Sequence, residues 1–301
     1  MHARAGFALS LMTAALWGSL PVAMKPLAER LDFVTITWIR YLVAAAGMTV
    51  FLRGTGGLPD PRTLRPFQWL LLLVAFGGFL GNNFGYLIGL RNTSASTAQI
   101  LIQLAPILVI FGAAYFFKEH FGRWQAIGVA TLVAGVLLFF NHKLTNFGAA
   151  DPNFNTGVTA LLCAAVVWAS YALAQKKLLQ AMSSVAVMAF VYACGSVLMA
   201  PFATPSMLKD LDSTRAWLLA YACLNSLLGY GFFSEALARW EAGKVSAVVA
   251  LAPLFTVFFS YFFAWMLPGF VAVEPLDAGN IAGAALVVAG CMMTSLGRGP
   301  K

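Results

Sequence analysis

Charged side chains are scarce in this sequence. Asp, Glu, Lys and Arg together make up 10% of its 301 residues, and the 19 basic residues are scattered over short segments between apolar stretches. No Lys/Arg cluster exists that would follow a phosphate backbone, so we expect no nucleic-acid partner despite a pI of about 9.5. The four cysteines lie in apolar stretches without the spacing of metal ligands, and the three histidines lie between such stretches. We therefore expect neither a metal nor a cofactor.

Enzyme motifs are missing as well. The sequence contains no H-E-x-x-H, no G-x-S-x-G and no glycine-rich phosphate loop. We therefore predict that the chain is not an enzyme and does not contain an ATP-driven pump.

Apolar residues, in contrast, are abundant. They make up 60% of the chain and give it a mean hydropathy of +0.81, which excludes soluble folds. About twenty helical residues cross a hydrocarbon core of roughly 30 Å, and a helix satisfies its own backbone groups there. We predict an all-α integral membrane protein. Its ten transmembrane helices lie near residues 6–25, 33–52, 67–90, 97–117, 124–141, 157–175, 184–202, 216–239, 245–267 and 278–296. The first resembles a signal sequence, but nothing distinguishes it from the later spans, so we expect it to be retained.

Basic residues are unevenly divided between the two sides of such a bundle. Twelve Lys and Arg residues lie on the side of the N-terminus, six lie on the other side, and only Arg40 lies within a span. Because basic loops stay in the cytoplasm, we predict that both termini are cytoplasmic.

The chain contains the same pattern twice. "GFALSLMTAALWGSLPVAMK" (6–25) aligns without gaps with "GVTALLCAAVVWASYALAQK" (157–176), and "AQILIQLAPILVIFGAAYFF" (98–117) matches "VSAVVALAPLFTVFFSYFFA" (245–264). We predict a first unit at 1–141, a polar linker at 142–156 and a second unit at 157–301, with five helices in each unit. Because five is odd, the second unit enters the membrane from the opposite side. Secondary transporters use such inverted repeats to build a site at mid-membrane.

The repeated motifs also resemble a known family. Each half has "LAP" in its fourth span, a glutamate after it (Glu119 and Glu274), and a fifth span with "IGVATLVAG" (127–135) or "AGAALVVAG" (282–290). This pattern resembles the EamA repeat of the drug/metabolite transporter superfamily, and most of all the bacterial inner-membrane exporters of amino acids, particularly aromatic ones. The resemblance implies export of aromatic or neutral amino acids and related small metabolites by alternating access. It also implies a largely apolar central cavity lined by spans one, three, four, six, eight and nine.

Two tryptophans differ from the others in their depth. Six lie at span ends, where indole rings anchor at the membrane interface, whereas Trp17 and Trp168 lie about twelve residues into their spans at equivalent repeat positions. Rings at this depth either pack the first and sixth helices together or stack on a substrate. We predict that they line the cavity.

Polar side chains within the spans are further candidates, because such groups face a cavity or another helix. Asn82, Asn83 and Tyr86 lie within about one turn of span three, and Gln99 and Gln103 share a face of span four. Their amides suit a zwitterionic substrate, but they would equally suit hydrogen bonds between spans three and four. The predicted substrate-binding residues are Trp17, Phe79, Asn82, Asn83, Tyr86, Gln99, Gln103, Trp168, Asn225 and Phe232.

Prolines and ionisable residues within spans complete the candidates. Pro21, Pro106 and Pro253 are predicted to interrupt spans one, four and nine, either as hinges or as bends that serve packing. Glu235 precedes Arg239 by four residues, which favours a structural ion pair over ion coupling. Arg40 is expected to reach the outer interface or to pair with Asp32.

Proton coupling stays open at this point. The small multidrug-resistance relatives in the superfamily depend on a carboxylate in their first span, and residues 6–25 contain none.

Two alternatives to amino-acid export stay open as well. Other members of the superfamily carry sugar phosphates or nucleotide sugars, but such anions need cations at mid-depth, and the sequence offers only Arg40, Lys25 and Lys176. A channel-like pore or a membrane scaffold is the alternative from a different class. Inverted halves argue against a scaffold, and flux without saturation would indicate a pore.

Overall fold

The fold is all-helical in a computed structural model, which describes residues 2–55, 64–93, 98, 101–119, 121–139, 152–266 and 277–296. No β-strand occurs within these ranges. The helices of the first half are α1 (His2–Ala28), α2 (Phe33–Thr55), α3 (Pro66–Asn92), α5 (Leu104–Phe116) and α6 (Arg123–Phe139). Those of the second half are α8 (Pro152–Leu178), α9 (Ser184–Met199), α10 (Ser213–Arg239), α11 (Ala242–Val249), α12 (Ala252–Met266) and α13 (Ala278–Leu296). Two short 3-10 helices, η2 (Ala200–Phe202) and η3 (Pro205–Asp210), connect α9 to α10.

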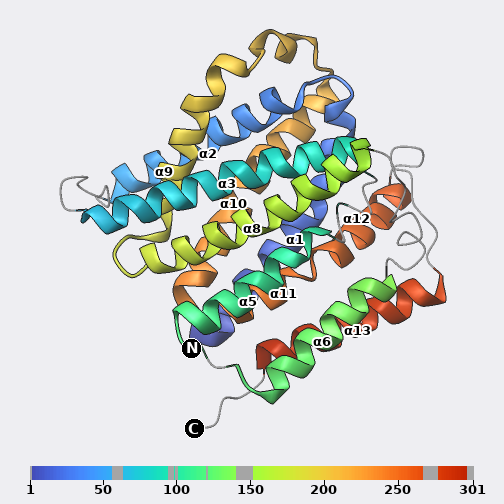
Figure 1. The fold of residues 1–301 in the computed structure, drawn as a ribbon. Helices are drawn as coiled ribbons and strands as arrows, with labels where there is room; N and C mark the ends of the chain where they lie inside the picture. Colours follow the sequence, from blue (N-terminus) through green and yellow to red (C-terminus); the bar gives the residue numbers. More distant parts are fainter. Residues whose placement is uncertain are drawn as a thin grey trace.

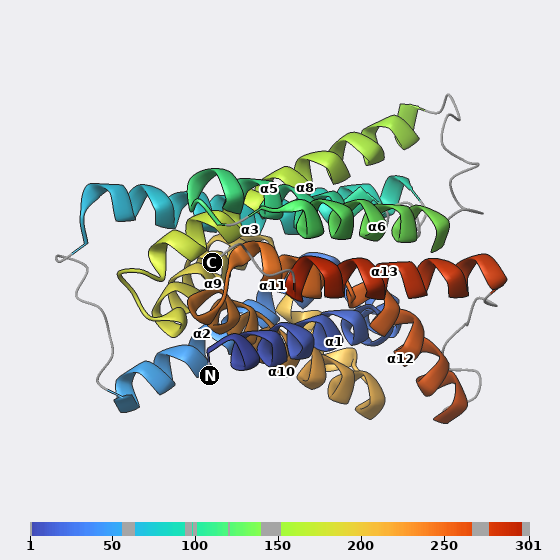
Figure 2. The ribbon, with the colours of Figure 1, turned by 90° about the horizontal axis from the view of Figure 1, so that it is seen from below.

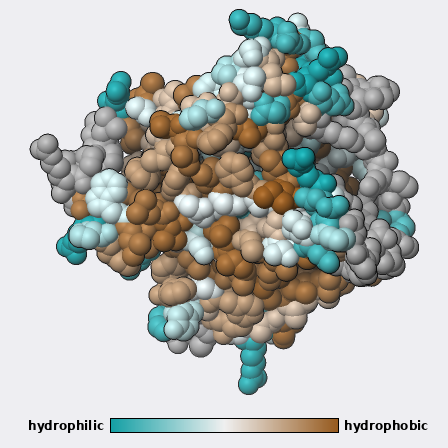
Figure 3. Space-filling view, turned by 45° about the horizontal axis from the view of Figure 1, so that its top comes forward, coloured by the Kyte–Doolittle hydropathy of each residue, from teal (hydrophilic) through white to brown (hydrophobic). Residues whose placement is uncertain are grey.

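Length and hydropathy mark these helices as membrane spans. Seven helical segments are long and apolar enough to cross a bilayer, with α11 and α12 counted as one, and three shorter apolar helices correspond to α5, α6 and α13. Each predicted span overlaps one of these ten segments. Many large apolar side chains lie on the outside of the molecule, among them Trp217 and Trp265. Figure 3 shows one face of it with a broad hydrophobic centre and hydrophilic residues toward the margin. Such a surface is stable in lipid and unfavourable in water.

Spans four and nine are broken at matching positions. The helix of span four has a turn at Gln103 before α5, and that of span nine has a turn at residues 250–251 between α11 and α12. Pro106 and Pro253 therefore lie in the first turn of the helix that follows each break, where a missing backbone N–H has no cost. The expectation for Pro21 differs from the structure, because α1 continues through this residue without a break.

The main helix pairs join the two halves. α1 packs along α10, and α8 packs along α3, so the first helix of each half lies against the third helix of the other half. Likewise α1 contacts α12 and α8 contacts α5, whereas α2 pairs with α9 and α6 pairs with α13. Figure 1 shows α3 and α8 side by side, with the α6–α13 pair along one edge of the bundle. Exchanging the two halves therefore reproduces the same set of helix pairs.

Glycines allow the closest of these pairs. A Cβ added to Gly135 of α6 would lie 2.9 Å from the Gly283 carbonyl oxygen, and one added to Gly128 would lie 2.9 Å from that of Gly290. A Cβ on Gly85 of α3 would lie 2.9 Å from a carbonyl oxygen of α8. Lipid provides no hydrophobic drive for helix association, so close backbone contact at small residues selects the helix pairs.

The first turn of α1 and the last turn of α13 lie toward the same end of the bundle (Figure 2). A chain that crosses a membrane an even number of times has both of its ends on the same side, and the positions of these two turns agree with that.

Candidate functional site

Trp17 of α1 and Trp168 of α8 contact each other across the two halves of the chain. Their ring centroids lie 5.2 Å apart in an edge-to-face arrangement, at an interplanar angle of 75°. The Trp17 indole nitrogen is buried and has no hydrogen-bond partner among the described residues. Gly229 of α10 leaves room for this ring, because a Cβ there would lie 2.9 Å from that nitrogen. The two equivalent tryptophans thus form one contact across the repeat.

Further rings extend this pair into an aromatic cluster that links six helices. Tyr230 lies 4.8 Å from Trp17 and 4.8 Å from Phe79, and Phe233 lies 5.2 Å from Trp17 and 5.6 Å from Trp168, all between ring centroids. We use the name aromatic cluster for Trp17, Tyr41, Phe79, Trp168, Tyr171, Tyr192, Tyr230 and Phe233. These rings pack on one another, most of them with little exposed surface, and they carry four phenolic hydroxyls.

Amides near the cluster form hydrogen bonds across helix pairs. The Asn82 side-chain nitrogen donates to the Ala164 carbonyl of α8 at 3.1 Å, and that of Asn225 donates to the Leu16 carbonyl of α1 at 2.7 Å. Asn83 donates within α3, to the Phe79 carbonyl at 2.8 Å. The amides of Asn82 and Asn225 therefore connect spans three to six and eight to one. The alternative considered from the sequence was that the span-three amides bond to span four.

The other predicted site residues lie in differing surroundings. Gln103, at the break before α5, is 6% exposed, and its side-chain oxygen has no partner in the described part of the chain. Tyr86 is partly buried on α3, and Gln99 lies outside the described residues. Phe232 is partly exposed and makes no ring contact there, whereas its neighbour Phe233 is fully buried in the aromatic cluster. The ring that the second half contributes from this turn is therefore Phe233.

Both predicted environments of Arg40, the outer interface and a pair with Asp32, are wrong. Its side chain is 4% exposed, so it does not reach the interface, and its Nε donates to the Ser226 hydroxyl of α10 at 2.7 Å. Asp32 instead accepts hydrogen bonds from the backbone and hydroxyl of Thr35, at 2.9 and 2.6 Å. Asp32 lies eight residues before Arg40, about 12 Å along the chain in helical geometry, which explains why the two do not meet.

The other intramembrane carboxylate has the predicted partner. Glu235 forms an ion pair with Arg239 and accepts a hydrogen bond from Ser184 of α9. The pair is partly exposed at the end of α10.

Glu119 forms a contact that the sequence analysis did not anticipate. Its carboxylate accepts hydrogen bonds from the backbone nitrogens of Ala242, at 2.7 Å, and Gly243, at 3.0 Å, and so caps the N-terminus of α11. Left-handed backbone at Lys118 (φ 57°) turns the chain toward this contact. Glu119 thus belongs to one half and caps a helix of the other, where the helix dipole favours an anion.

Charge and burial around Glu119 set its protonation. Burial raises the pKa of the Glu119 carboxyl, and the two backbone hydrogen bonds and the nearby Lys176 oppose that effect in part. Lys176 itself donates to the carbonyls of Leu237 and Trp240 at the C-terminus of α10. An anion at the start of α11 and a cation at the end of α10 therefore hold this junction together.

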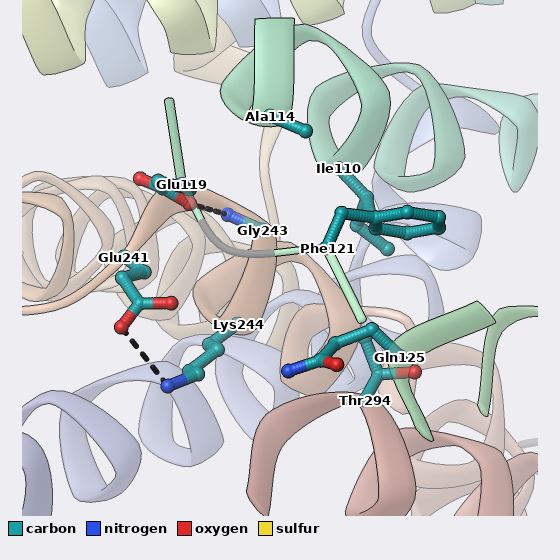
Figure 4. A pocket seen from close by; sticks show the side chains of 9 residues that line it. All are labelled: Ile110, Ala114, Glu119, Phe121, Gln125, Glu241, Gly243, Lys244 and Thr294. Atoms are coloured by element: carbon teal, nitrogen blue, oxygen red, sulfur yellow. Dashed lines mark hydrogen bonds and ion pairs between the residues drawn. The ribbon is translucent and has the colours of Figure 1, made fainter. Parts of the chain in front are cut away.

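A small hollow opens beside the junction (Figure 4). It encloses about 270 Å³, including space open to the surroundings. It is lined by Ile110, Ala114, Glu119, Phe121, Gln125, Glu241, Gly243, Lys244 and Thr294. Figure 4 shows Glu241 directed to Lys244, at 2.9 Å, and Glu119 to Gly243. The hollow lies at the end of the bundle, away from the aromatic cluster, and its carboxylates are already paired.

Comparison with known proteins identifies the family. The model of the EamA-like transporter family matches residues 4–141 and again residues 155–296. The chain belongs to the EamA-like transporter family. It is thus a multi-pass EamA membrane transporter, as the ten apolar helical segments also indicate.

Relatives of this EamA transporter are membrane transporters too. The chain is 36% identical to "Uncharacterized inner membrane transporter YhbE" of Escherichia coli K12, over 97% of this chain and 91% of the relative. It is 33% identical to an "Uncharacterized transporter" of Haemophilus influenzae, over 97% and 95%. A "Probable amino-acid metabolite efflux pump" of Salmonella typhimurium is 26% identical, over 99% and 96%. A crystal structure aligns with a TM-score of 0.75 over 97% of both chains at 17% identity, which shows that the fold is shared.

Sequence reasoning found the tryptophan pair of this EamA transporter but not its surroundings. Tyr41, Tyr192 and Tyr230 were missed because an aromatic residue in an apolar span is ordinary. Glu119 could have been predicted as a cap from its position just after the end of the helix that contains "LAP". From the sequence, that position was interpreted only as a feature of the family.

Proposed function

We propose that this EamA transporter is a secondary transporter that exports aromatic or neutral amino acids and related small metabolites by alternating access. Ten transmembrane helices form two inverted repeats, at 1–141 and 157–301, joined by the linker 142–156. The protein lies in a bacterial inner membrane with both termini in the cytoplasm.

The exchange symmetry of the helix pairs supports inverted repeats. The glycines that bring α6 and α13 together are repeat equivalents with their partners exchanged. Gly128, the equivalent of Gly283, lies against Gly290, and Gly135, the equivalent of Gly290, lies against Gly283. Two equivalent helices that pack antiparallel with equivalent residues exchanged are related by a two-fold axis. Five spans in each half place that axis in the membrane plane.

The observation that carries the substrate proposal is the Trp17–Trp168 contact. It joins equivalent positions of the two repeats within a cluster of eight rings. A site on the axis between inverted repeats faces either side of the membrane when the two groups of helices move. Aromatic rings there favour a cargo with an aromatic or apolar side chain. The name of the Salmonella relative, an amino-acid metabolite efflux pump, agrees with that cargo.

The helix pairs also suggest which parts move. α1 packs on α10 and α12, and α8 packs on α3 and α5, so each group contains helices of both halves. Trp17 belongs to the first group and Trp168 to the second. Motion between these groups opens one end of the site and closes the other, and the Glu119 cap on α11 holds one of these ends closed.

A sugar phosphate or nucleotide sugar is less compatible with this site. Lys176 is directed to the end of α10, where its ammonium is already bound by two carbonyls. Among the described residues beside the rings, only Arg40 could compensate a multiply charged phosphate, and the excess negative charge is very unfavourable at low dielectric.

Flux in proteoliposomes tests the proposed cargo. We expect saturable flux of labelled phenylalanine that unlabelled tryptophan inhibits, measured with and without a pH gradient to reveal coupling to protons. Flux that does not saturate would indicate a pore, and transport of threonine or a quaternary amine without phenylalanine would contradict the aromatic cargo.

Cysteine labelling tests the inversion. The loops before α3 and before α10 are repeat equivalents and contain Arg65 and Lys209. In a variant without its native cysteines, Arg65→Cys and Lys209→Cys should react with an impermeant maleimide from opposite sides, Arg65→Cys from the cytoplasm. Reaction of both from the same side would contradict inverted repeats.

A further inference from the structure

Arg40 is a cation deep in the protein with no carboxylate beside it. Its Nε donates to the Ser226 hydroxyl, and the four other guanidinium N–H groups have no hydrogen-bond partner among the described residues. The ion pairs within the described ranges belong to Arg215, Arg239 and Lys244. A charge with a single neutral partner is costly in a membrane interior, and such residues are retained where they have a function.

Other polar groups on the same face of α2 also lack partners. The Thr37 hydroxyl and the Tyr41 hydroxyl are both buried without a hydrogen bond within the described ranges. Residues three and four apart share a helix face, so Thr37, Arg40 and Tyr41 lie together. This face thus has one cation and two unused hydroxyl donors, which matches an anion with several lone pairs.

The aromatic cluster lies next to this polar face. The Tyr41 ring lies 5.2 Å from Phe79 and 5.5 Å from Tyr192, and Phe79 leads through Tyr230 to Trp17. One cation and an extended ring surface are therefore adjacent.

We propose that Arg40 binds the carboxylate of the transported solute while the aromatic cluster binds its apolar side chain. The planar guanidinium matches a carboxylate through two parallel hydrogen bonds, and one cation balances one negative charge. The cargo class is thus a monocarboxylate with an aromatic or apolar side chain. This inference rests on the proposed transport function.

The test compares three labelled solutes that differ in their charged groups: phenylalanine, 3-phenylpropionate and phenylethylamine, which lacks the carboxylate. Wild-type proteoliposomes should carry phenylalanine and prefer it to phenylethylamine. Arg40→Gln should raise the KM for phenylalanine roughly 10- to 100-fold, the range for a lost charge-assisted hydrogen bond, and abolish the preference. Arg215→Gln is the matched control, because Arg215 lies at the start of α10 with Glu29 and Asp212 as partners, and should leave both unchanged.

Folding is monitored by thermal unfolding of the detergent-solubilised variants. If Arg40→Gln does not fold, Arg40→Lys takes its place, because lysine keeps the charge but cannot form two parallel hydrogen bonds with a carboxylate. A several-fold rise in KM for phenylalanine and 3-phenylpropionate, without a rise for phenylethylamine, supports the inference. The unfolding temperature of the wild type should rise with phenylalanine and less with phenylethylamine, and no difference between them counts against a carboxylate site.

The outcomes separate this inference from the proposed cargo. Unchanged phenylalanine transport by Arg40→Gln, or an equal loss for phenylethylamine, overturns the role of Arg40 and leaves amino-acid export standing. Wild-type transport of 3-phenylpropionate without phenylalanine, lost in Arg40→Gln, supports Arg40 and contradicts the amino-acid cargo.

Discussion

Removal of the Glu119 carboxylate should loosen the junction at the start of α11. The carboxylate accepts two backbone hydrogen bonds there, at 2.7 and 3.0 Å, and Glu241 at the N-cap position makes no side-chain cap. Glu119→Ala leaves both N–H groups without this partner. Loss of a capping side chain costs about 1–2 kcal/mol. The upper value of about 2 kcal/mol shifts an opening equilibrium about 30-fold.

Amide hydrogen exchange in nanodiscs measures this opening. Protection of the amides in α11 (Ala242–Val249) should fall about 30-fold in Glu119→Ala, the figure derived above from the lost cap. Glu241→Ala is the matched control, because the Glu241 side chain is 40% exposed and pairs with Lys244, and such pairs contribute less than about 1 kcal/mol. Equal protection in Glu119→Ala and the wild type would show that the cap does not hold the junction.

The pH dependence of this junction has a defined sign. Burial raises the pKa of Glu119 above its ordinary value of 4.5, with Lys176 and Glu241 as the charged groups facing it. The closed junction, in which the Glu119 pKa is raised, is stabilised by protonation as the pH falls. This stabilisation is lost as the pH rises through the raised pKa. Protection of α11 should therefore increase from pH 7 to pH 5, after correction for intrinsic exchange. Glu119→Gln should remove this dependence, and a decrease in the wild type would contradict the assignment.

Three further predictions concern other parts of the protein. Trp168→Ala should reduce phenylalanine flux by a larger fraction than it reduces the yield of folded protein, because the ring contacts Trp17 in the proposed site. Equal losses in the two measurements would assign the ring to packing. Glu235→Gln should keep most of the transport activity in proteoliposomes, since the ion pair of Glu235 with Arg239 is partly exposed and contributes less than about 1 kcal/mol. Loss of pH-driven uptake would instead indicate that Glu235 takes part in ion coupling. Gly283→Ala should destabilise the protein by about 1–3 kcal/mol, because its Cβ would lie 2.8 Å from the Gly135 carbonyl oxygen. Gly77→Ala, with open space around it, should not, and similar unfolding temperatures for both variants would contradict close α6–α13 packing.

The sequence predicted the spans well and their breaks less well. Ten apolar stretches followed from hydropathy, which reports burial in lipid directly, and the repeat followed from alignment of the two halves. The breaks near Pro106 and Pro253 were predicted at the prolines but lie up to three residues earlier, because a proline is accommodated in the first turn of the next helix. Pro21 lacks any such break, since a long membrane helix tolerates a single lost backbone bond.

The site was harder to predict because these helices are apolar on all sides. In such a helix no periodicity marks the face that packs inward. Phe232 was chosen in place of Phe233, and one residue rotates a side chain by about 100° around the helix. The tryptophan pair was found because repeat equivalence and depth do not depend on knowing that face. Arg40 was recognised as isolated, but its partner on α10 depended on helix pairing that sequence does not reveal.

Helix pairing also narrows the roles of the polar residues near the cluster. Lipid solvates apolar side chains as well as a protein interior does, so specific pairs must arise from close contacts and hydrogen bonds between helices. Gly85 and Asn82 provide both for the α3–α8 pair, and Asn225 provides a hydrogen bond for the α1–α10 pair. Amide N–H groups used in this way cannot also hold a solute carboxylate without weakening the pair. Near the cluster, the described donors without a partner are those of Arg40, the Thr37 and Tyr41 hydroxyls and the Trp17 indole N–H. In the proposed site they are available to a carboxylate, and the rings are left for the side chain.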